Sequence, residues 1–214
     1  MYNYHCYKIK EAGRLLADLL NTIVFMYVTL VPVILAGILN MIWVKLPILK
    51  FLSKPVDFGR NFVDGRRIFG DNKTWKGIAG YLIFNTLFAV IWGVVCRQAG
   101  INSWNFFYWR HENTFAYNLL IGFLLGLGYS LFELPNSFLK RRFDIKPGKS
   151  VSGFTKVFFI FLDQADSIFG VALVVWLFCD IGVLCYLLYV LVGAATHLIL
   201  NMLLYFMKLR KNMF

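Results

Sequence analysis

The sequence has little charge and few of the residues on which soluble enzymes usually rely. Only 15% of its 214 residues are charged and three are histidines. The four cysteines form no CxxC pair: Cys6, Cys96, Cys179 and Cys185. Their spacing predicts neither a disulfide framework nor a zinc site. The P-loop pattern GxxxxGK[ST] is also absent. Acidic residues are scarce, since 11 Asp and Glu stand against 22 Lys and Arg, giving a formal net charge of +11.

Apolar residues dominate the chain instead. They make up 59% of it, including 22 Phe, 11 Tyr and 6 Trp, and the mean hydropathy is +0.65. This composition excludes a disordered chain, a collagen-like repeat and a coiled coil, and it is too apolar for a soluble domain. Five segments reach the roughly 20 apolar residues that a membrane-spanning helix needs: 19–44, 77–96, 115–134, 157–178 and 181–207. We therefore expect residues 1–214 to form a single all-α membrane domain with five spans.

The distribution of Lys and Arg predicts the orientation of these spans, because basic residues gather in cytoplasmic loops. With five spans, 17 of the 22 Lys and Arg fall on one side, in loops 45–76 and 135–156 and in the C-terminal tail. This predicts a multi-pass protein of the cell membrane with its N-terminus outside and its C-terminus in the cytoplasm. The positive charge then reflects topology and phosphate binding, so we expect no nucleic-acid partner. Residues 1–18 could instead lie in the membrane interface as a short amphipathic helix.

Asp163 and Asp166 are the strongest anomaly in this pattern, because they lie inside the fourth apolar segment. A spacing of three residues places both on one helix face. An ionised Asp near the bilayer centre costs about 2.5–3.5 kcal/mol, so the pair must face water, a cation or basic partners. One interpretation is a Mg²⁺ site completed by water and substrate phosphates; the alternative is a structural pairing with Lys or Arg. We expect His197, in the fifth segment, to bond between helices rather than to act in catalysis.

Glu133 is the second anomaly, at the end of the third apolar segment. If that helix continues past Pro135, then Glu133, Ser137, Lys140 and Arg141 fall along one face. An acid, a hydroxyl group and two cations on one face are typical of a surface that binds phosphate and metal. The alternative is an interfacial glutamate beside ordinary loop cations.

The loop before the second apolar segment combines glycines with basic residues between positions 57 and 77. Backbone N–H groups of such a loop can approach phosphate oxygens while Lys and Arg neutralise them. The helix that follows adds the positive end of its dipole. A contact with lipid headgroups is the alternative. The candidates for phosphate contacts are the basic residues Arg66, Arg67, Lys73 and Lys76.

Two stretches together resemble a known superfamily. Residues 137–146 read Ser-Phe-Leu-Lys-Arg-Arg-Phe-Asp-Ile-Lys, and residues 163–166 read Asp-Gln-Ala-Asp. They are similar to the SxLKRxxxxK and DxxD patterns of the CTP-dependent phosphatidate cytidylyltransferase superfamily. The DQxD form, the five spans and residues 65–77 most resemble its CDP-archaeol synthase branch. Two departures are Pro147, where the phosphatidate branch has Asp, and Glu133, where many members have Asp.

The resemblance implies that a lipid phosphate attacks the α-phosphorus of CTP, giving a CDP-lipid and pyrophosphate. The implied partners are CTP, a membrane lipid phosphate and the lipid bilayer, and the branch favours an unsaturated isoprenoid ether lipid. The implied cofactor is Mg²⁺, bound by Asp163 and Asp166 with Glu133. Catalysis is assigned by resemblance to Ser137, Lys140, Arg141, Asp163 and Asp166. Nucleotide binding is assigned to Arg66, Arg67, Asn72, Lys73, Thr74, Lys76 and Lys146.

Two other functions stay open on the sequence. A CDP-alcohol phosphotransferase would also combine membrane helices, acidic residues and Mg²⁺, but its DGxxAR pattern fails because Arg-Arg-Ile-Phe follows Asp64-Gly65. A transporter or another non-enzymatic membrane protein could use the Asp pair as an ion site. The repeat symmetry that is typical of transporters is not visible in this sequence.

Overall fold

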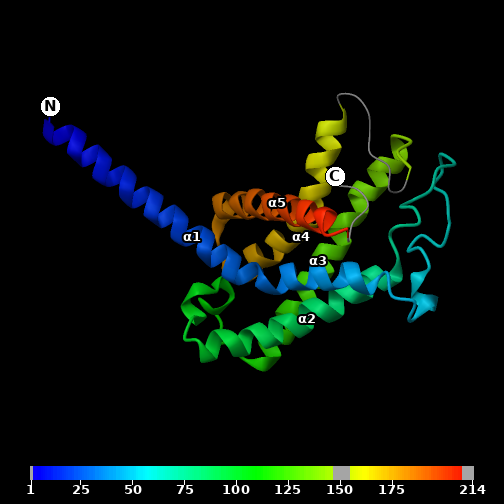
Figure 1. Ribbon diagram of the computed structural model, residues 1–214, viewed down its shortest axis with the longest axis horizontal. Helices are drawn as coiled ribbons and strands as arrows, with labels where there is room; N and C mark the ends of the chain where they lie inside the picture. The colour runs from blue at the N-terminus through cyan, green and yellow to red at the C-terminus, as the bar shows by residue number, and fades with distance from the viewer. Residues whose placement is uncertain (1, 147–154, 209–214) are drawn as a thin grey trace.

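The computed structural model describes residues 2–146 and 155–208. Four residues named above or counted as basic lie outside this range: Pro147, Lys149, Arg210 and Lys211. Five long helices make up most of the described chain (Figure 1): α1 (Tyr2–Trp43), α2 (Trp75–Gln98), α3 (Phe115–Arg142), α4 (Thr155–Cys179) and α5 (Gly182–Phe206). All five include stretches long and apolar enough to cross a membrane. The prediction of an all-α protein with five spans is confirmed.

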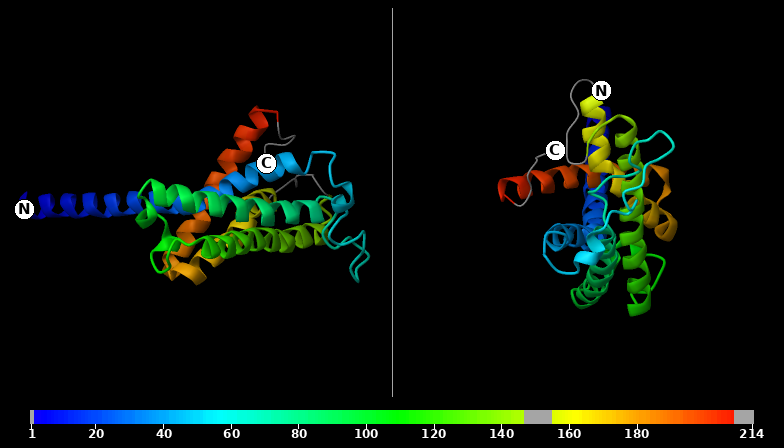
Figure 2. Two further views of the ribbon diagram at one scale, coloured as in Figure 1. Left: turned by 90° about the horizontal axis from the view of Figure 1, so that it is seen from below. Right: turned by 90° about the vertical axis from the view of Figure 1, so that its right-hand side faces the viewer.

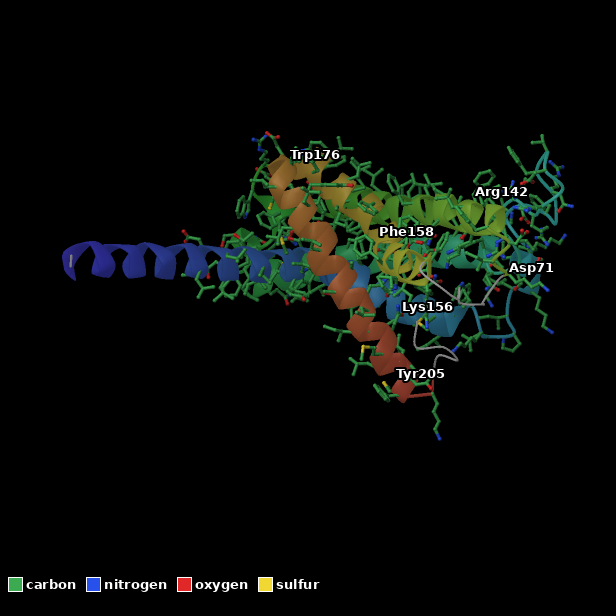
Figure 3. The ribbon with its side chains drawn as sticks, turned by 90° about the horizontal axis from the view of Figure 1, so that it is seen from above. Asp71, Arg142, Lys156, Phe158, Trp176 and Tyr205 are labelled. Carbon is green, nitrogen blue, oxygen red and sulfur yellow. The ribbon has the colours of Figure 1, made fainter. Side chains whose placement is uncertain are left out.

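Helices that follow one another in the chain also pack together: α1 on α2, α2 on α3, α3 on α4 and α4 on α5. The N-terminal part of α1 extends beyond the other helices, and α5 crosses the bundle at an angle (Figures 1 and 2). Because consecutive spans alternate in direction, segment 44–74, the end of α3 and the start of α4 meet at one end of the bundle. We call it the loop end. Figure 3 shows Asp71 and Arg142 there and Trp176 towards the opposite end.

Small residues bring α3 close to both of its neighbours. A Cβ atom placed on Gly126 would lie 2.6 Å from the backbone oxygen of Tyr81 on α2. One placed on Gly170 of α4 would lie 2.1 Å from the backbone oxygen of Gly128. Such close approach of backbones is typical of packed membrane helices. Gly170 is about one turn from Asp166, so this crossing brings the polar faces of α3 and α4 into contact.

Most helix ends differ from the predicted segments by one or two residues, and three of the differences have a clear physical cause or a larger extent. α2 begins at Trp75 because the hydroxyl group of Thr74 caps it, accepting from the backbone N–H three residues on at 3.2 Å. α3 continues through Pro135 to Arg142. The proline removes one backbone hydrogen bond, but the following turn is buried against α4 and keeps its helical form. α1 is unbroken from its start, so residues 2–18 belong to the first long helix rather than to a separate one.

Candidate active site

The polar faces of α3 and α4 meet towards the loop end of the bundle. Asn136 of α3 bridges the two aspartates of α4, because its side-chain NH₂ group donates to Asp163 Oδ1 and to Asp166 Oδ2, both at 2.7 Å. Asn136 and Asp166 are buried. The Oδ1 atom of Asn136 has no hydrogen-bond partner among the described residues. The two aspartates therefore share one helix face, as their spacing predicts, and a buried acceptor oxygen beside them is unused.

Two lysines balance the carboxylates around this point. The Lys140 ammonium group donates to Asp163 Oδ2, and the Lys73 ammonium group donates to Glu133 Oε2 at 2.5 Å. Lys140 comes from the same α3 face as Glu133, whereas Lys73 comes from segment 44–74. Burial alone would lower the pKa of Lys73, but the three nearby carboxylates act in the opposite direction and raise it above its ordinary value. Lys73 therefore stays charged inside the acidic cluster.

Asp57 organises segment 44–74, although the sequence pattern does not single it out. Its buried carboxylate accepts from the Arg67 guanidinium group at 2.7 Å and from three backbone N–H groups at 2.9–3.0 Å, among them those of Phe69 and Gly70. Burial acts to raise the pKa of Asp57, but these donors outweigh burial and hold the pKa well below its ordinary value. The ionised carboxylate thus fixes the turn that leads to Lys73.

Segment 44–74 is also tied to the end of α3. Arg142 donates to the backbone oxygen of Arg67 at 2.6 Å and forms an ion pair with Asp64 at 2.9 Å. Arg66 pairs with Asp144, just beyond α3, at 2.8 Å. Both guanidinium groups that the sequence predicts to bind phosphate, those of Arg66 and Arg67, are therefore engaged by carboxylates. In this structure they hold the loop in shape and against α3.

A cavity of about 350 Å³ opens between segment 44–74 and the adjoining parts of α1, α2 and α3. Its lining includes predicted nucleotide-binding residues and one predicted metal ligand: Asn72, Lys73, Thr74, Lys76 and Glu133. Lys76 is buried, and its ammonium group donates to the backbone oxygen of Leu46 at 2.6 Å. The same group lies 5.0 Å from the ring centre of Trp43. Lys76 thus joins the start of α2 to the end of α1.

Arg141 brings unused donors to the same region. It is buried, and its Nε and Nη1 atoms have no hydrogen-bond partner in the part of the chain that the structure describes. Ser137 is buried one turn earlier on the same face, whereas Lys146 is exposed. The Lys140–Asp163 ion pair agrees with the alternative interpretation of the aspartates, which is a structural pairing with Lys or Arg. The unused atoms of Arg141 and Asn136 are different, because they are buried polar groups that a bound ligand would satisfy.

Comparison with known proteins adds independent evidence. The family model described as CarS-like, CDP-archaeol synthase, matches residues 15–214. The chain belongs to this family. The region shared with the CDP-archaeol synthase family contains α2 to α5 and segment 44–74, so it includes every site residue named above.

Curated relatives carry the same family name. The CDP-archaeol synthases of Pyrococcus furiosus and Saccharolobus islandicus are each 35% identical to the chain, over 107 and 120 residues. These matches cover 50% and 56% of the chain and 56% and 57% of the two relatives, so the chain spans little more than half of their length. The CDP-archaeol synthase of Pyrobaculum aerophilum is 32% identical over 158 residues, which are 74% of the chain and 80% of that relative.

A solved structure of an intramembrane enzyme for archaeal membrane lipids biosynthesis is similar in fold. It superposes on the chain with a TM-score of 0.52 and 23% sequence identity, over 82% of this chain and 92% of that one. At this identity the likeness shows that the two proteins share the arrangement of their helices.

The structure brings together one group of the predicted residues and leaves another apart. Those that meet around the α3–α4 crossing or line the adjoining cavity are Lys73, Asn72, Thr74, Lys76, Glu133, Lys140, Asp163 and Asp166. Ser137 and Arg141 are buried on the same stretch of α3. Those that form other contacts or are exposed are Arg66, Arg67 and Lys146. Sequence reasoning misses Asn136 and Asp57. The sequence does contain one indication of Asn136, because this residue lies three positions after Glu133 and therefore on the same helix face.

Mg²⁺ is the cofactor that the resemblance implies, and the donor set can be compared with its needs. No group of three or more His, Cys, Asp or Glu side chains suited to a metal ion is found in residues 2–146 and 155–208, and Glu133 pairs with Lys73 instead. Mg²⁺ needs only one or two carboxylates where water and substrate phosphates supply its other ligands. Asp163 and Asp166, with the unused oxygen of Asn136, fit that requirement.

Proposed function

We propose that this chain transfers the cytidylyl group of CTP to a membrane lipid phosphate, giving a CDP-lipid and pyrophosphate. The observation that carries the proposal is the group at the α3–α4 crossing. There, two aspartates are joined by Asn136, and a lysine-lined cavity adjoins the cluster. Further along α3, the buried donors of Arg141 are unused. Membership of the CDP-archaeol synthase family supports the same reaction.

The depth of the acidic pair suits a lipid substrate. Asp163 and Asp166 lie eight and eleven residues after Thr155, the first residue of α4, which is about 12–17 Å along the helix. A lipid phosphate lies at headgroup level while its chains stay in the hydrocarbon layer. Carboxylates at this depth can meet the phosphate without extracting the lipid from the membrane.

We place the triphosphate of CTP in the lysine-lined cavity, whose volume of about 350 Å³ lies within the range of ligand pockets. Lys73 and Lys140 each contact a carboxylate through a flexible side chain, so the same ammonium groups can turn to phosphate oxygens. Arg141 presents two unused buried donors, its Nε and Nη1 groups, which can bind phosphate oxygens. Asn72 and Thr74 are the proposed contacts to the base or the ribose.

The reaction forms a bond between a lipid phosphate oxygen and the α-phosphorus of CTP. It breaks the bond from that phosphorus to the bridging oxygen, which leaves with pyrophosphate. A phosphate monoester is largely ionised at neutral pH, so no general base is needed, and catalysis rests on positioning and charge neutralisation. Lys140 and Arg141 would hold phosphate oxygens, and Ser137 would donate a hydrogen bond. Bound by Asp163 and Asp166, Mg²⁺ would neutralise charge on the phosphates.

We further propose that the loop end faces the cytoplasm of the cell, where CTP is made, and that the protein lies in the cell membrane. The excess of Lys and Arg in loops 45–76 and 135–156 supports this orientation. Substrate and nucleotide would then approach the aspartates from the same side of the bilayer.

The experiment that tests the function follows two labels in parallel. Purified protein in detergent is given Mg²⁺ and CTP labelled in either its α- or its γ-phosphate, with isoprenoid ether or acyl ester lipid phosphates as acceptors. We expect the α-label to enter the lipid fraction and the γ-label to be released as pyrophosphate, with the ether lipid as the better acceptor. Absence of α-label from every lipid, together with ion uptake into liposomes, would favour the transporter instead.

A further inference from the structure

An apolar cavity adjoins the polar one, between α1 and α5. It is open on one side, encloses about 80 Å³, and is lined mainly by apolar side chains of residues 30–41 and 193–204, together with Tyr81 and Tyr129. Met41 and Tyr81 line the polar cavity as well. The two cavities therefore adjoin at these two side chains, one compartment rich in charge and the other nearly free of it.

The helices that border this groove are joined at one end and part towards the other. The hydroxyl groups of Tyr27 on α1 and Thr196 on α5 lie within hydrogen-bond distance, at 3.0 Å. Further along α5, its C-terminal part projects out of the bundle (Figures 1 and 2), and Figure 3 shows Tyr205 there, well away from Trp176. The α1 residues that line the groove, from Leu30 to Met41, follow the Tyr27 contact in the direction of the loop end.

Polar side chains of α5 in the groove bond to α4 next to the aspartates. The side-chain N–H group of Asn201 donates to Gln164 Oε1 at 2.7 Å, and His197 Nδ1 lies 3.2 Å from the backbone oxygen of Gln164. Gln164 is buried between the two aspartates in the chain. Because these polar groups are hydrogen-bonded, burying them beside a hydrocarbon ligand costs less free energy. The same bonds tie the groove wall to the turn that carries Asp163.

We propose that the groove between α1 and α5 binds a hydrocarbon chain of the lipid substrate while its phosphate lies in the polar cavity. This inference rests on the proposed function and adds the place of the chain. A lipid phosphate has an apolar and a charged part, so it matches two adjoining compartments of opposite polarity. Bulk bilayer lipid is the other occupant to consider, but its binding in the groove would not require a phosphate in the polar cavity beside Tyr81. Gly37 gives the groove its width, because a Cβ atom there would meet nothing within 4 Å.

The substitution Gly37→Leu tests this assignment by filling the groove. Leucine favours a helix more than glycine does, so we expect the protein to fold. Displacing about two methylene groups of the lipid weakens binding roughly tenfold. We therefore expect the KM for a long isoprenoid lipid phosphate to rise roughly tenfold. The KM for CTP, and the kinetics with the same headgroup on two short prenyl chains, should match wild type. Ala17→Leu, on an exposed part of α1, is the matched control and should change nothing.

Photo-crosslinking measures the same contact without turnover. A lipid phosphate that carries a diazirine near its chain end should label residues 30–41 and 193–204, and unlabelled lipid phosphate should compete while a neutral lipid should not. Equal competition by the neutral lipid, or an unchanged KM in Gly37→Leu, would overturn the proposal. If wild type makes no CDP-lipid, the proposed function fails, whereas competition at the groove still reports separately whether lipid phosphate binds there.

Discussion

Replacing Asp57 by Asn is expected to release the turn of segment 44–74 that leads to Lys73. One carboxylate oxygen of Asp57 accepts from the Arg67 guanidinium group and one backbone N–H, and the other accepts from the N–H groups of Phe69 and Gly70. Asn has the same shape, but its NH₂ group cannot accept a hydrogen bond. In either orientation of the amide, two of these donors would face that NH₂ group.

The size of the effect follows from the burial of this ion pair. The Asp57 side chain has 0% exposure, and removing one partner of a buried pair typically costs about 3–5 kcal/mol. We take about 3 kcal/mol as the loss of loop stability, because Asn retains part of the hydrogen bonding. If CTP binding has to restore the loop and the whole of this loss reduces the free energy of binding, the Kd for CTP rises about 100-fold.

Calorimetric titration with CTP and limited proteolysis of segment 44–74 measure the two consequences directly. We expect Asp57→Asn to bind CTP more weakly and to be cleaved faster in this segment, with little change in thermal unfolding of the helices. The matched control is Asp144→Asn, since Asp144 pairs with Arg66 of the same segment at 2.8 Å but is 72% exposed, and such pairs contribute about 1 kcal/mol or less. Wild-type CTP affinity and wild-type protease resistance in Asp57→Asn would refute the reasoning.

Two further predictions concern acid and the buried arginine. Because the folded pKa of Asp57 lies below its ordinary value of 3.8, its contribution to loop stability is complete above that pH and is lost as the pH falls through the folded value. Protease resistance of segment 44–74 should therefore decline only below about pH 4, and Asp57→Asn should lack this transition; a decline near neutrality would contradict it. Arg141→Lys keeps the charge but loses the two unused guanidinium donors, so the KM for CTP should rise about tenfold. Arg60→Lys, exposed in the same loop, is its control, and an unchanged KM in Arg141→Lys would remove Arg141 from the phosphate site.

The number and type of the helices could be predicted because a span needs a long apolar run, and five such runs stand out in the sequence. Their ends could not be predicted as well. Thr74 starts α2 earlier than hydropathy indicates, because a cap is a local hydrogen bond and not an apolar feature. α3 passes through Pro135 because the turn that follows it is buried against α4, which depends on packing between helices.

The acidic part of the site could also be predicted, because a carboxylate inside an apolar segment is costly unless it faces water, a cation or a basic partner. Asp163 and Asp166 stand out for that reason. In the structure Asn136 bridges them, and Lys140 pairs with Asp163. The arginines of segment 44–74 show where such reasoning stops. Arg66 pairs with Asp144, which is distant in the chain, so its partner is known only once α3 and the loop meet. Asn136 is missed because an asparagine near a helix end is an ordinary residue until its neighbours are known.

Cytidylyl transfer by Asp163→Asn is the measurement that tests the central claim most directly. The variant, wild type and Asp180→Asn are assayed with CTP and a lipid phosphate across a range of Mg²⁺ concentrations. Asp180 is an exposed control that pairs with Arg110 at 2.9 Å, away from the α3–α4 crossing. We expect Asp163→Asn to lose at least about 100-fold in kcat and to need more Mg²⁺, and Asp180→Asn to match wild type. A wild-type kcat and an unchanged Mg²⁺ dependence in Asp163→Asn would contradict the account.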